Sequence, residues 1–529
     1  MKEGKSNKGK IILICIAVVI LFLIFYLPSL LEKQLSERLS DGVYTTTNGS
    51  YRLEFFDLEV KFFPLQLILS KPSLIPVRND TVLTSVSISA EIMHLNDLDL
   101  KAILFKKHLS IGDITFVKPA VYIYRSVSEK DTGVVVKKEK GRVDSLTIGH
   151  IHIIDAAITL FSNESDSIVL SAKHNGIEIK NLKLVAEKVN KSAGFSAGAF
   201  TADLHDLEWK LEKGFYALKT KNIYFDYNSS YVQVDSLMLQ PLYSEKKFAA
   251  KSVYQTDRFE CFIRKVSILN CDINRALKYK VVNADSLIID GGNITAYRNK
   301  NYQRKIEVIP SLQERIAECP VVINLNGCSV HNIDVAYKEL AEGQNVAGII
   351  RIKSIDADVS KVSTGHVSSD TLKILSTARL MSGGSMHVVW KFPMQHKKVR
   401  FLTSGTIENF KVTDINSMSL PNIHVEFIDG FINKLQFNMS ADHNSAKGEV
   451  YMNYRDLKVS IKDKNGNNSL GGVTSLAVNK LFIHENNPEK NHELRKGTIA
   501  YPNNPQRFMF NYAFKALSTG ISDAVLMRK

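Results

Sequence analysis

Apolar and polar residues alternate with a period of two along much of this chain, and this alternation constrains the fold more than any other feature. It is clear in segments 86–92, 223–227, 386–392 and 457–461. Successive side chains of a strand point to opposite faces of a sheet, so each segment predicts a strand with one apolar and one polar face. This pattern is typical of antiparallel sheets, and the chain is therefore expected to be mainly β and antiparallel.

Part of the pattern is repeated. Residues 109–124 and 146–161 both fit L-[ST]-I-G-x-I-x-[FI]-[VI]-x-x-A-x-[YT]-[IL]-[YF], at an offset of 37 residues (146 minus 109). The alternation changes phase at Gly112 and Gly149, the fourth position of each copy, which predicts a bulge or corner there. Repeated strand–corner–strand units indicate stacking along an axis, so we expect an elongated, curved sheet rather than separate globular domains.

An almost unbroken apolar segment, IILICIAVVILFLIFYL, occupies residues 11–27. As a helix it would extend about 25 Å, close to the hydrocarbon thickness of a bilayer once Leu30 and Leu31 are included. Four Lys and one Glu precede it in residues 1–10, and this basic excess favours a cytoplasmic N-terminus. A cleaved signal peptide is disfavoured because no small-residue cleavage triplet appears before Lys33. We expect a single-pass anchor over residues 11–31 with an extracytoplasmic body.

The composition excludes several classes of protein. Charged residues make up 23% of the chain, which is too many for a multi-span membrane protein, and 44% of residues are hydrophobic, which argues against disorder. The net charge of +14 is spread without a dense basic block, so nucleic acid is not an expected partner. The excess of positive charge is consistent with attraction to anionic lipid headgroups, and equally with simple solubility.

Five cysteines are present, of which Cys15 lies in the predicted anchor. Cys261, Cys271, Cys319 and Cys328 match no zinc or haem spacing. In an oxidising compartment they allow three disulfide connectivities, and buried free thiols are the alternative.

The expected organisation has six parts. They are a cytoplasmic tail (1–10), the anchor (11–31), an N-terminal β region (32–125), a charged linker (126–142), a repetitive β body (143–500) and a C-terminal amphipathic helix (501–529). Other helical patterns follow the anchor and occur around residues 98–104. In the C-terminal helix, spacings of three and four define an apolar stripe of Phe510, Phe514, Leu517, Ile521 and Val525. This stripe could lie on a membrane surface, plug the end of the sheet or dock on the core.

The sequence contains no catalytic signature, so we expect no enzyme, no catalytic residues and no cofactor. The nearest approach to a metal motif is His150-Ile-His152, whose rings lie on one face of a strand as two zinc ligands could. No third ligand is predictable from the sequence. A solvent-facing pair is therefore favoured, and no metal site is expected.

Several segments resemble the AsmA-like family of envelope proteins in bacteria with two membranes. They include residues 51–67, the strand at 85–92 and the stretch Lys106–Arg125 with its Pro-Ala before a strand; near the C-terminus they include 430–437, 448–459 and 510–521. The resemblance implies an inner-membrane anchor in a Gram-negative cell, followed by a periplasmic, taco-like β-groove linked to lipid transport and outer-membrane biogenesis.

Three functions are considered. The leading one is lipid handling in envelope homeostasis, in which a groove shelters or transfers phospholipid acyl chains. The candidate lining residues are Leu65, Leu67, Leu69, Val86, Ile88, Ala90, Ile92, Ile151 and Ile153. The second is a scaffold or assembly factor for outer-membrane proteins, whose strands would pair with a sheet edge. The third, a hydrolase, is disfavoured because acidic and His residues form no convergent motif.

Overall fold

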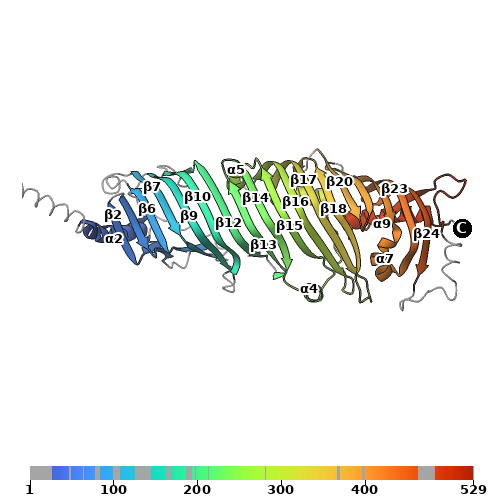
Figure 1. The fold of residues 1–529 in the computed structure, drawn as a ribbon, viewed down its shortest axis with the longest axis horizontal. Helices are drawn as coiled ribbons and strands as arrows, with labels where there is room; N and C mark the ends of the chain where they lie inside the picture. The colour runs from blue at the N-terminus through green and yellow to red at the C-terminus, as the bar shows by residue number, and fades with distance from the viewer. Residues whose placement is uncertain are drawn as a thin grey trace, which may run out of the picture. The chain divides into compact units, whose positions relative to one another are not determined.

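The structure is a computed structural model that describes residues 27–46, 49–62, 65–77, 84–98, 108–125, 145–162, 168–185, 194–196, 198–211, 214–279, 281–365, 370–395, 399–462 and 483–527. The chain is mainly β, with one large open sheet and a helix near the C-terminus (Figure 1). Both features confirm the sequence prediction.

The sheet is mostly antiparallel, as the alternation predicts, but three of its described strand pairings are parallel. Both β7 (His108–Val117) and β8 (Ala120–Arg125) pair in parallel with β9 (Ser145–Ser162). In the same way, β16 (Val281–Asn299) pairs in parallel with β17 (Val322–Leu340). Period-two alternation describes the two faces of a strand and does not encode the direction of its neighbour.

The chain divides into two units, residues 1–210 with 220–228 and residues 211–219 with 229–529. The other elements of the first unit are α2 (Leu27–Thr46), β1 (Tyr51–Glu54), β2 (Asp57–Phe62), β3 (Leu65–Ser70), β4 (Ser73–Pro76), β5 (Thr84–Ser89), β6 (Ile92–Leu98), β10 (Ile168–Val185), β11 (Gly194–Ser196) and β12 (Ala199–Lys210). Strand β13 (Tyr216–Asp226) contributes residues to both units.

The second unit contains further strands and several short helices. Its strands are β14 (Tyr231–Pro241), β15 (Arg258–Leu269), β18 (Gly348–Val359), β19 (Val362–Ser363), β20 (Thr371–Leu380), β21 (Gly384–Pro393), β22 (Val399–Lys411), β23 (Val425–Asp442), β24 (Ser445–Ile461) and β25 (Lys496–Pro502). Its helices are α4 (Glu245–Ser252), α5 (Ile273–Tyr279), α6 (Leu312–Ala317), η2 (Val412–Ile415), α7 (Asn416–Ile423) and α9 (Met509–Val525). Of these helices, only α9 was predicted from the sequence.

The two copies of the sequence repeat lie side by side. Strands β7 and β8 align with β9 so that Leu109 faces Leu146 and Ala120 faces Ala157. Each of these pairs is 37 residues apart, which is the repeat offset. Equivalent residues are therefore direct neighbours across a parallel strand pair.

The predicted phase change at the repeat glycines is a kink that continues into the neighbouring strands. A Cβ at Gly149 would lie 2.5 Å from the carbonyl oxygen of Gly112, so the strands approach too closely for a side chain at this point. The positive φ angles fall on the flanking strands instead, at Asp97 and Asn181, both with φ of 52°. Side-chain alternation can thereby change phase while the apolar residues stay on one face.

Helix α2 covers one end of the first unit. Leu35 packs with Leu58, Val60, Leu67 and Leu69 in a buried cluster that also includes residues of β6, β7, β9 and β10. The side chains of α2 also bond to the strands that end the sheet here. Glu32 Oε1 accepts from the backbone N–H of Val60 at 3.1 Å, and Ser40 Oγ donates to the carbonyl of Leu53 at 2.7 Å.

Helix α9 covers β24 and β25 in the second unit. It contacts them through small residues, because Ala516 and Ala524 are fully buried and a Cβ at Gly497 of β25 would lie 1.9 Å from the carbonyl oxygen of Gly520. Its side chains also accept from the outer N–H groups of β25. Asp523 Oδ2 lies 2.8 Å from Thr498 N, and Thr519 Oγ1 lies 3.3 Å from Ala500 N.

Several predictions fall outside the described residues. These are the tail, most of the anchor (11–26), the charged linker and the helical pattern after Leu98. Residues 27–31 form the first turn of α2. Among the described helices, none combines the length and the hydropathy that crossing a bilayer requires.

Candidate functional site

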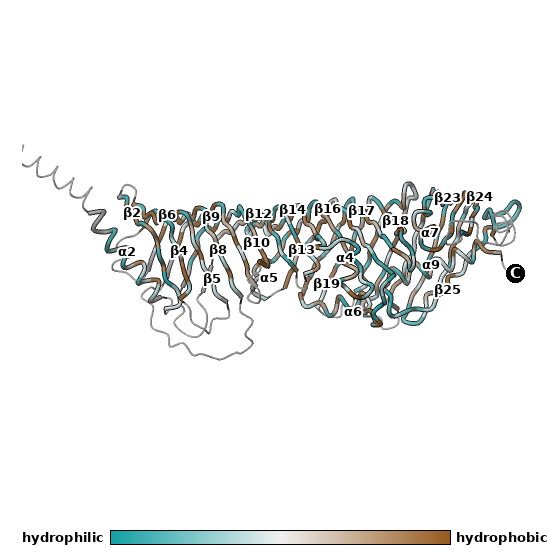
Figure 2. Tube along the Cα trace, turned by 90° about the horizontal axis from the view of Figure 1, so that it is seen from below, coloured by the Kyte–Doolittle hydropathy of each residue, from teal (hydrophilic) through white to brown (hydrophobic). Residues whose placement is uncertain are grey.

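Three rows of apolar side chains run across strands β14, β15, β16 and β17 of the second unit. We call these twelve residues the central rows. They are Val232, Ile268, Leu287 and Cys328; Val234, Val266, Ile289 and Val330; and Leu239, Cys261, Ile294 and Val335, each row given in the order of the strands. The alternation of hydrophobic and hydrophilic residues along these strands can be followed in Figure 2.

Kinks in β14, β16 and β17 explain how the rows share one face on these three strands. The third row is five residues from the second along every strand, a separation that would reverse the face in a regular strand. Between the two rows, Ser236, Gly291 and Asn332 have positive φ. A kink of this kind restores the phase, as at the repeat glycines, so the apolar face continues across it.

The opposite face of the same strands is polar. Asp235, Lys265, Asp290 and His331 are direct neighbours across β14–β17. Asp290 also accepts a hydrogen bond from Arg264 at 2.7 Å. Because water solvates this face, the sheet here has one wettable and one apolar side.

All twelve residues of the central rows are only partly buried. None belongs to the buried cluster at α2, to the cluster at α9 or to the smaller cluster around Phe410. A contiguous set of partly exposed apolar side chains on neighbouring strands is typical of a surface that binds an apolar partner. The central rows are therefore the candidate functional site.

A group of charged residues continues the apolar face beyond the third row. Arg298 lies four residues after Ile294 and pairs with Asp257 through Nε at 2.6 Å and Nη2 at 2.5 Å. Lys300 Nζ donates to Glu339 at 2.6 Å, and Tyr337 donates to the same carboxylate at 2.7 Å. We call these five residues the polar end.

Burial and neighbouring charges shift the pKa of two residues of the polar end, Arg298 and Tyr337. Burial lowers the pKa of Arg298, but the hydrogen bonds and the charge of Asp257 raise it by more, so the net shift is upward. Burial, followed by the charge of Glu339, raises the pKa of Tyr337. Tyr337 therefore stays protonated and donates to Glu339. With two cations and two anions, this group presents polar contacts without a net charge.

The lining residues predicted from the sequence lie in the first unit. Leu67, Leu69 and Ile151 are buried in the α2 cluster, and Leu65 and Ile153 pack partly against it. Ala90 is also buried, whereas Val86, Ile88 and Ile92 are partly buried.

The central rows were not predicted from the sequence. One pattern in the sequence could have indicated them, which is the apolar spacing of Val232, Val234, Leu237 and Leu239. This spacing changes phase at Asp235-Ser236, as the alternation does at the repeat glycines.

The predicted stripe of α9 is divided between two environments. Leu517, Ile521 and Val525 pack partly against the α9 cluster, whereas Phe510 and Phe514 are each 59% exposed. The ring of Phe510 lies 5.6 Å from that of Trp390 on β21. Two large aromatic side chains thus remain accessible on this helix.

The four described cysteines are free thiols. Burial raises the pKa of Cys261, Cys271 and Cys328, so these thiols are protonated and poorly nucleophilic at neutral pH. Cys261 and Cys328 instead contribute apolar surface to the central rows.

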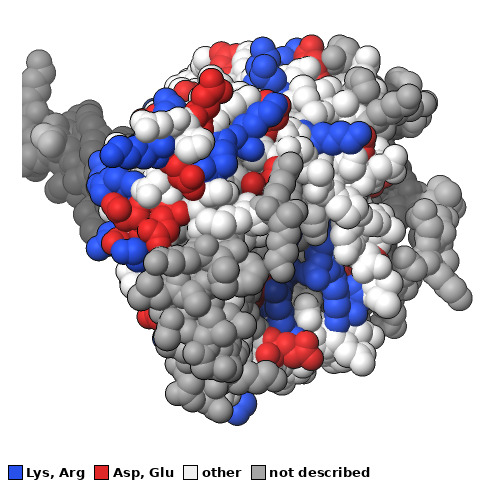
Figure 3. Space-filling model, turned by 90° about the vertical axis from the view of Figure 1, so that its right-hand side faces the viewer, with Lys and Arg blue, Asp and Glu red and all other residues white. Residues whose placement is uncertain are grey.

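Charged residues of both signs are interspersed on the face of the molecule shown in Figure 3, which agrees with the dispersed net charge. Comparison of the chain with protein-family models and with curated protein sequences gives no match.

Proposed function

We propose that this protein shelters the acyl chains of a phospholipid, or of another envelope lipid, on the central rows, without catalysing a reaction. The observation that carries the proposal is the contrast in burial within one unit. The apolar face is packed beneath α9, whereas the same kind of face on β14–β17 is only partly buried. The apolar surface that these twelve side chains still expose is unfavourable by about 25 cal/mol for each Å² that a ligand could bury.

The arrangement suits an amphiphile better than a compact ligand. Three rows across four strands provide a continuous apolar surface, and an acyl chain needs such a surface with little directional bonding. The polar end adjoins the third row and offers hydrogen-bonding groups where an amphiphile has its headgroup. We further propose that the sheet curves around the rows as an open groove.

The cellular setting of the proposal comes from the sequence. The apolar segment at 11–31 and its basic flank support an anchor in the inner membrane, with a periplasmic body, and the resemblance to AsmA-like proteins supports a role in the cell envelope. The exposed Phe510 and Phe514 are candidates for contact with a membrane surface.

The alternative, an assembly factor that pairs its sheet edge with client strands, is less well supported. Strand addition needs free backbone donors and acceptors at an edge. On β25, two outward N–H groups are already bonded to α9, and on β2 the N–H of Val60 is bonded to α2. Helices therefore occupy positions that a client strand would need.

Site-specific photo-crosslinking tests the proposal. A benzophenone amino acid replaces Ile289 in the central rows or, as the matched control, the adjacent Asp290 on the opposite face. After irradiation in cells, the Ile289 position should yield a lipid adduct that mass spectrometry detects, and the Asp290 position should not. Equal labelling at both positions, or protein adducts alone at Ile289, would contradict lipid binding on this face.

A further inference from the structure

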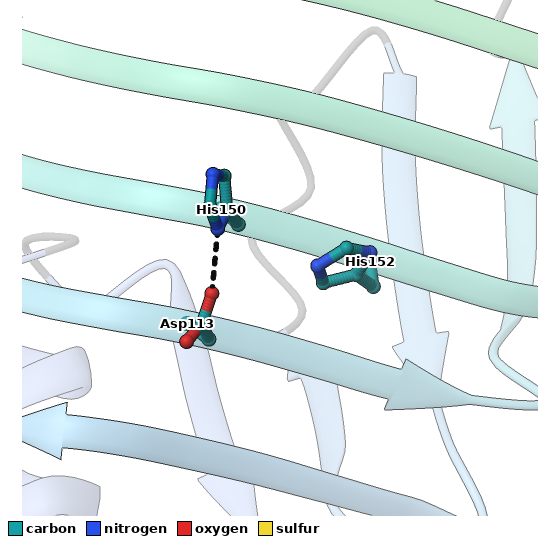
Figure 4. Close-up of side chains that lie close together, drawn as sticks. All are labelled: Asp113, His150 and His152. Carbon is teal, nitrogen blue, oxygen red and sulfur yellow. Dashed lines mark hydrogen bonds and ion pairs between the residues drawn. The ribbon is translucent and has the colours of Figure 1, made fainter.

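A cluster of potential metal ligands lies on β7 and β9 of the first unit. Asp113 of β7 and His150 and His152 of β9 lie side by side (Figure 4). One ligand atom from each lies within 4.8 Å of those of the other two. Among the described residues, no other three His, Cys, Asp or Glu side chains come together in this way.

The repeat explains why these side chains meet. His150 and His152 are two residues apart in one strand, so both rings project from the same face. The parallel pairing of the repeat copies makes Asp113 the direct neighbour of His150, and Thr115 the neighbour of His152. The third ligand that the sequence analysis did not find is therefore the residue at the equivalent position of the other copy.

The distances suit a small divalent ion. Asp113 Oδ1 and His150 Nδ1 are 2.9 Å apart, and the rings of His150 and His152 are separated by 5.9 Å between centroids. Ligand bonds of about 2.0–2.1 Å at tetrahedral angles place neighbouring ligand atoms roughly 3.3 Å apart. A metal ion can thus replace the hydrogen bond between Asp113 and His150 after small side-chain rotations.

A fourth ligand is within reach on the next strand. Glu178 of β10 is the cross-strand neighbour of His152, and its Oε1 lies 3.9 Å from His152 Nδ1. On the other side, Asn96 neighbours Asp113, and its buried Oδ1 has no hydrogen-bond partner. The amide oxygen of Asn96 and the carboxylate of the neighbouring Asp113 together favour a nearby cation.

We propose that Asp113, His150 and His152 form a binding site for one divalent transition-metal ion, with Glu178 or water completing the coordination. Two imidazoles and a carboxylate favour Zn²⁺, Cu²⁺ or Ni²⁺ over Mg²⁺ and Ca²⁺, which prefer oxygen ligands. The strands are held by the sheet, so the ligands are positioned before the ion arrives. The bound ion joins the two repeat copies.

Calorimetric titration of the detergent-extracted full-length protein with Zn²⁺ tests the site. We expect one ion per chain, and His150→Gln or His152→Gln should weaken its binding at least about tenfold. His174→Gln is the matched control, because His174 forms a similar exposed pair with Asp155 at 2.7 Å but has no second histidine in a ligand cluster. The control should bind Zn²⁺ like the unmodified protein.

A second probe separates this site from the free thiols. Co²⁺ bound by nitrogen and oxygen ligands should show visible absorption without the near-ultraviolet thiolate charge-transfer band, and His152→Gln should remove that absorption. The proposal is overturned if Zn²⁺ binding is not saturable, if the His150 and His152 variants bind like the control, or if the Co²⁺ spectrum has thiolate character.

Discussion

The apolar face of the sheet is buried to different extents in two parts of the second unit. Beneath α9, Phe392, Phe401, Val450 and Ile499 are at most 1% exposed and pack into one large cluster. On β14–β17 the twelve residues of the central rows are all partly exposed. The strands are alike in alternation, so the difference lies in what covers them. A fully packed face stabilises the fold, and a face that stays partly exposed is available to a partner.

Helices α2 and α9 cover the sheet in a similar way. Each packs on an apolar cluster, and each accepts a hydrogen bond from an outward N–H group of the strand that ends the sheet locally. Exposed strand edges invite pairing with other chains, so covering them protects the protein from aggregation. The comparison predicts that substitutions in the buried cluster, at the helix–strand contact and at the strand edges will lower the stability by different amounts.

The largest effect is expected from the α9 cluster. Phe401→Ala should destabilise the surrounding strands by about 3–5 kcal/mol, because a fully buried aromatic side chain leaves a cavity. Ile289→Ala in the central rows should cost about 1 kcal/mol, since this side chain is already partly exposed. Native-state hydrogen exchange of the β22 and β16 amides measures both values. Equal costs would remove the distinction between the two regions.

The contact between α9 and β25 should be the next most sensitive. Gly497→Ala places a methyl group against the Gly520 carbonyl, so the helix must move away, at a cost of about 3 kcal/mol. Gly383→Ala is the control, because nothing lies within 4 Å of its added Cβ. Faster exchange confined to α9 and β25 in the first variant is the expected result. A Gly497→Ala variant that behaves like the control would show that the helix is not docked this closely.

Loss of an edge hydrogen bond should have a smaller effect. Asp523→Ala and Glu32→Ala each remove the acceptor of one edge N–H group, at about 1 kcal/mol or roughly fivefold faster exchange of the Thr498 or Val60 amide. Asp523→Asn and Glu32→Gln retain an acceptor oxygen and should restore most of the protection. If only one edge responds, the two helices do not protect their strands in the same way.

The smallest effect is expected from acid. Backbone N–H groups of Ser445, and then of Asn444, lower the pKa of Asp442 at the turn between β23 and β24. A lowered pKa in the folded state contributes stability above the unfolded value of about 4, and this contribution is lost as the pH falls through the folded pKa. Asp442→Asn should therefore reduce the acid-induced opening of this turn, measured by exchange corrected for its intrinsic pH dependence. If Asp442→Asn leaves the acid-induced opening unchanged, groups other than Asp442 cause that opening.

Much of the fold was predictable from local sequence. Alternation locates β13, β21 and β24, and helical spacing locates α9. The repeat glycines mark a kink because close strand approach excludes a side chain at Gly149. Short helices such as α6 and α7 were missed, because six to eight residues carry too little periodicity to stand out.

By itself, the sequence determined that this protein is mainly β, that its strands have one apolar face and that a repeat of 37 residues exists. Only the tertiary structure decided that the repeat copies pair in parallel, which brings Asp113 beside His150. It also decided which apolar faces are packed beneath helices and which are left partly open. The physical reason is that alternation encodes which side of a strand avoids water, whereas neighbours and covering elements come from contacts between residues far apart in the chain.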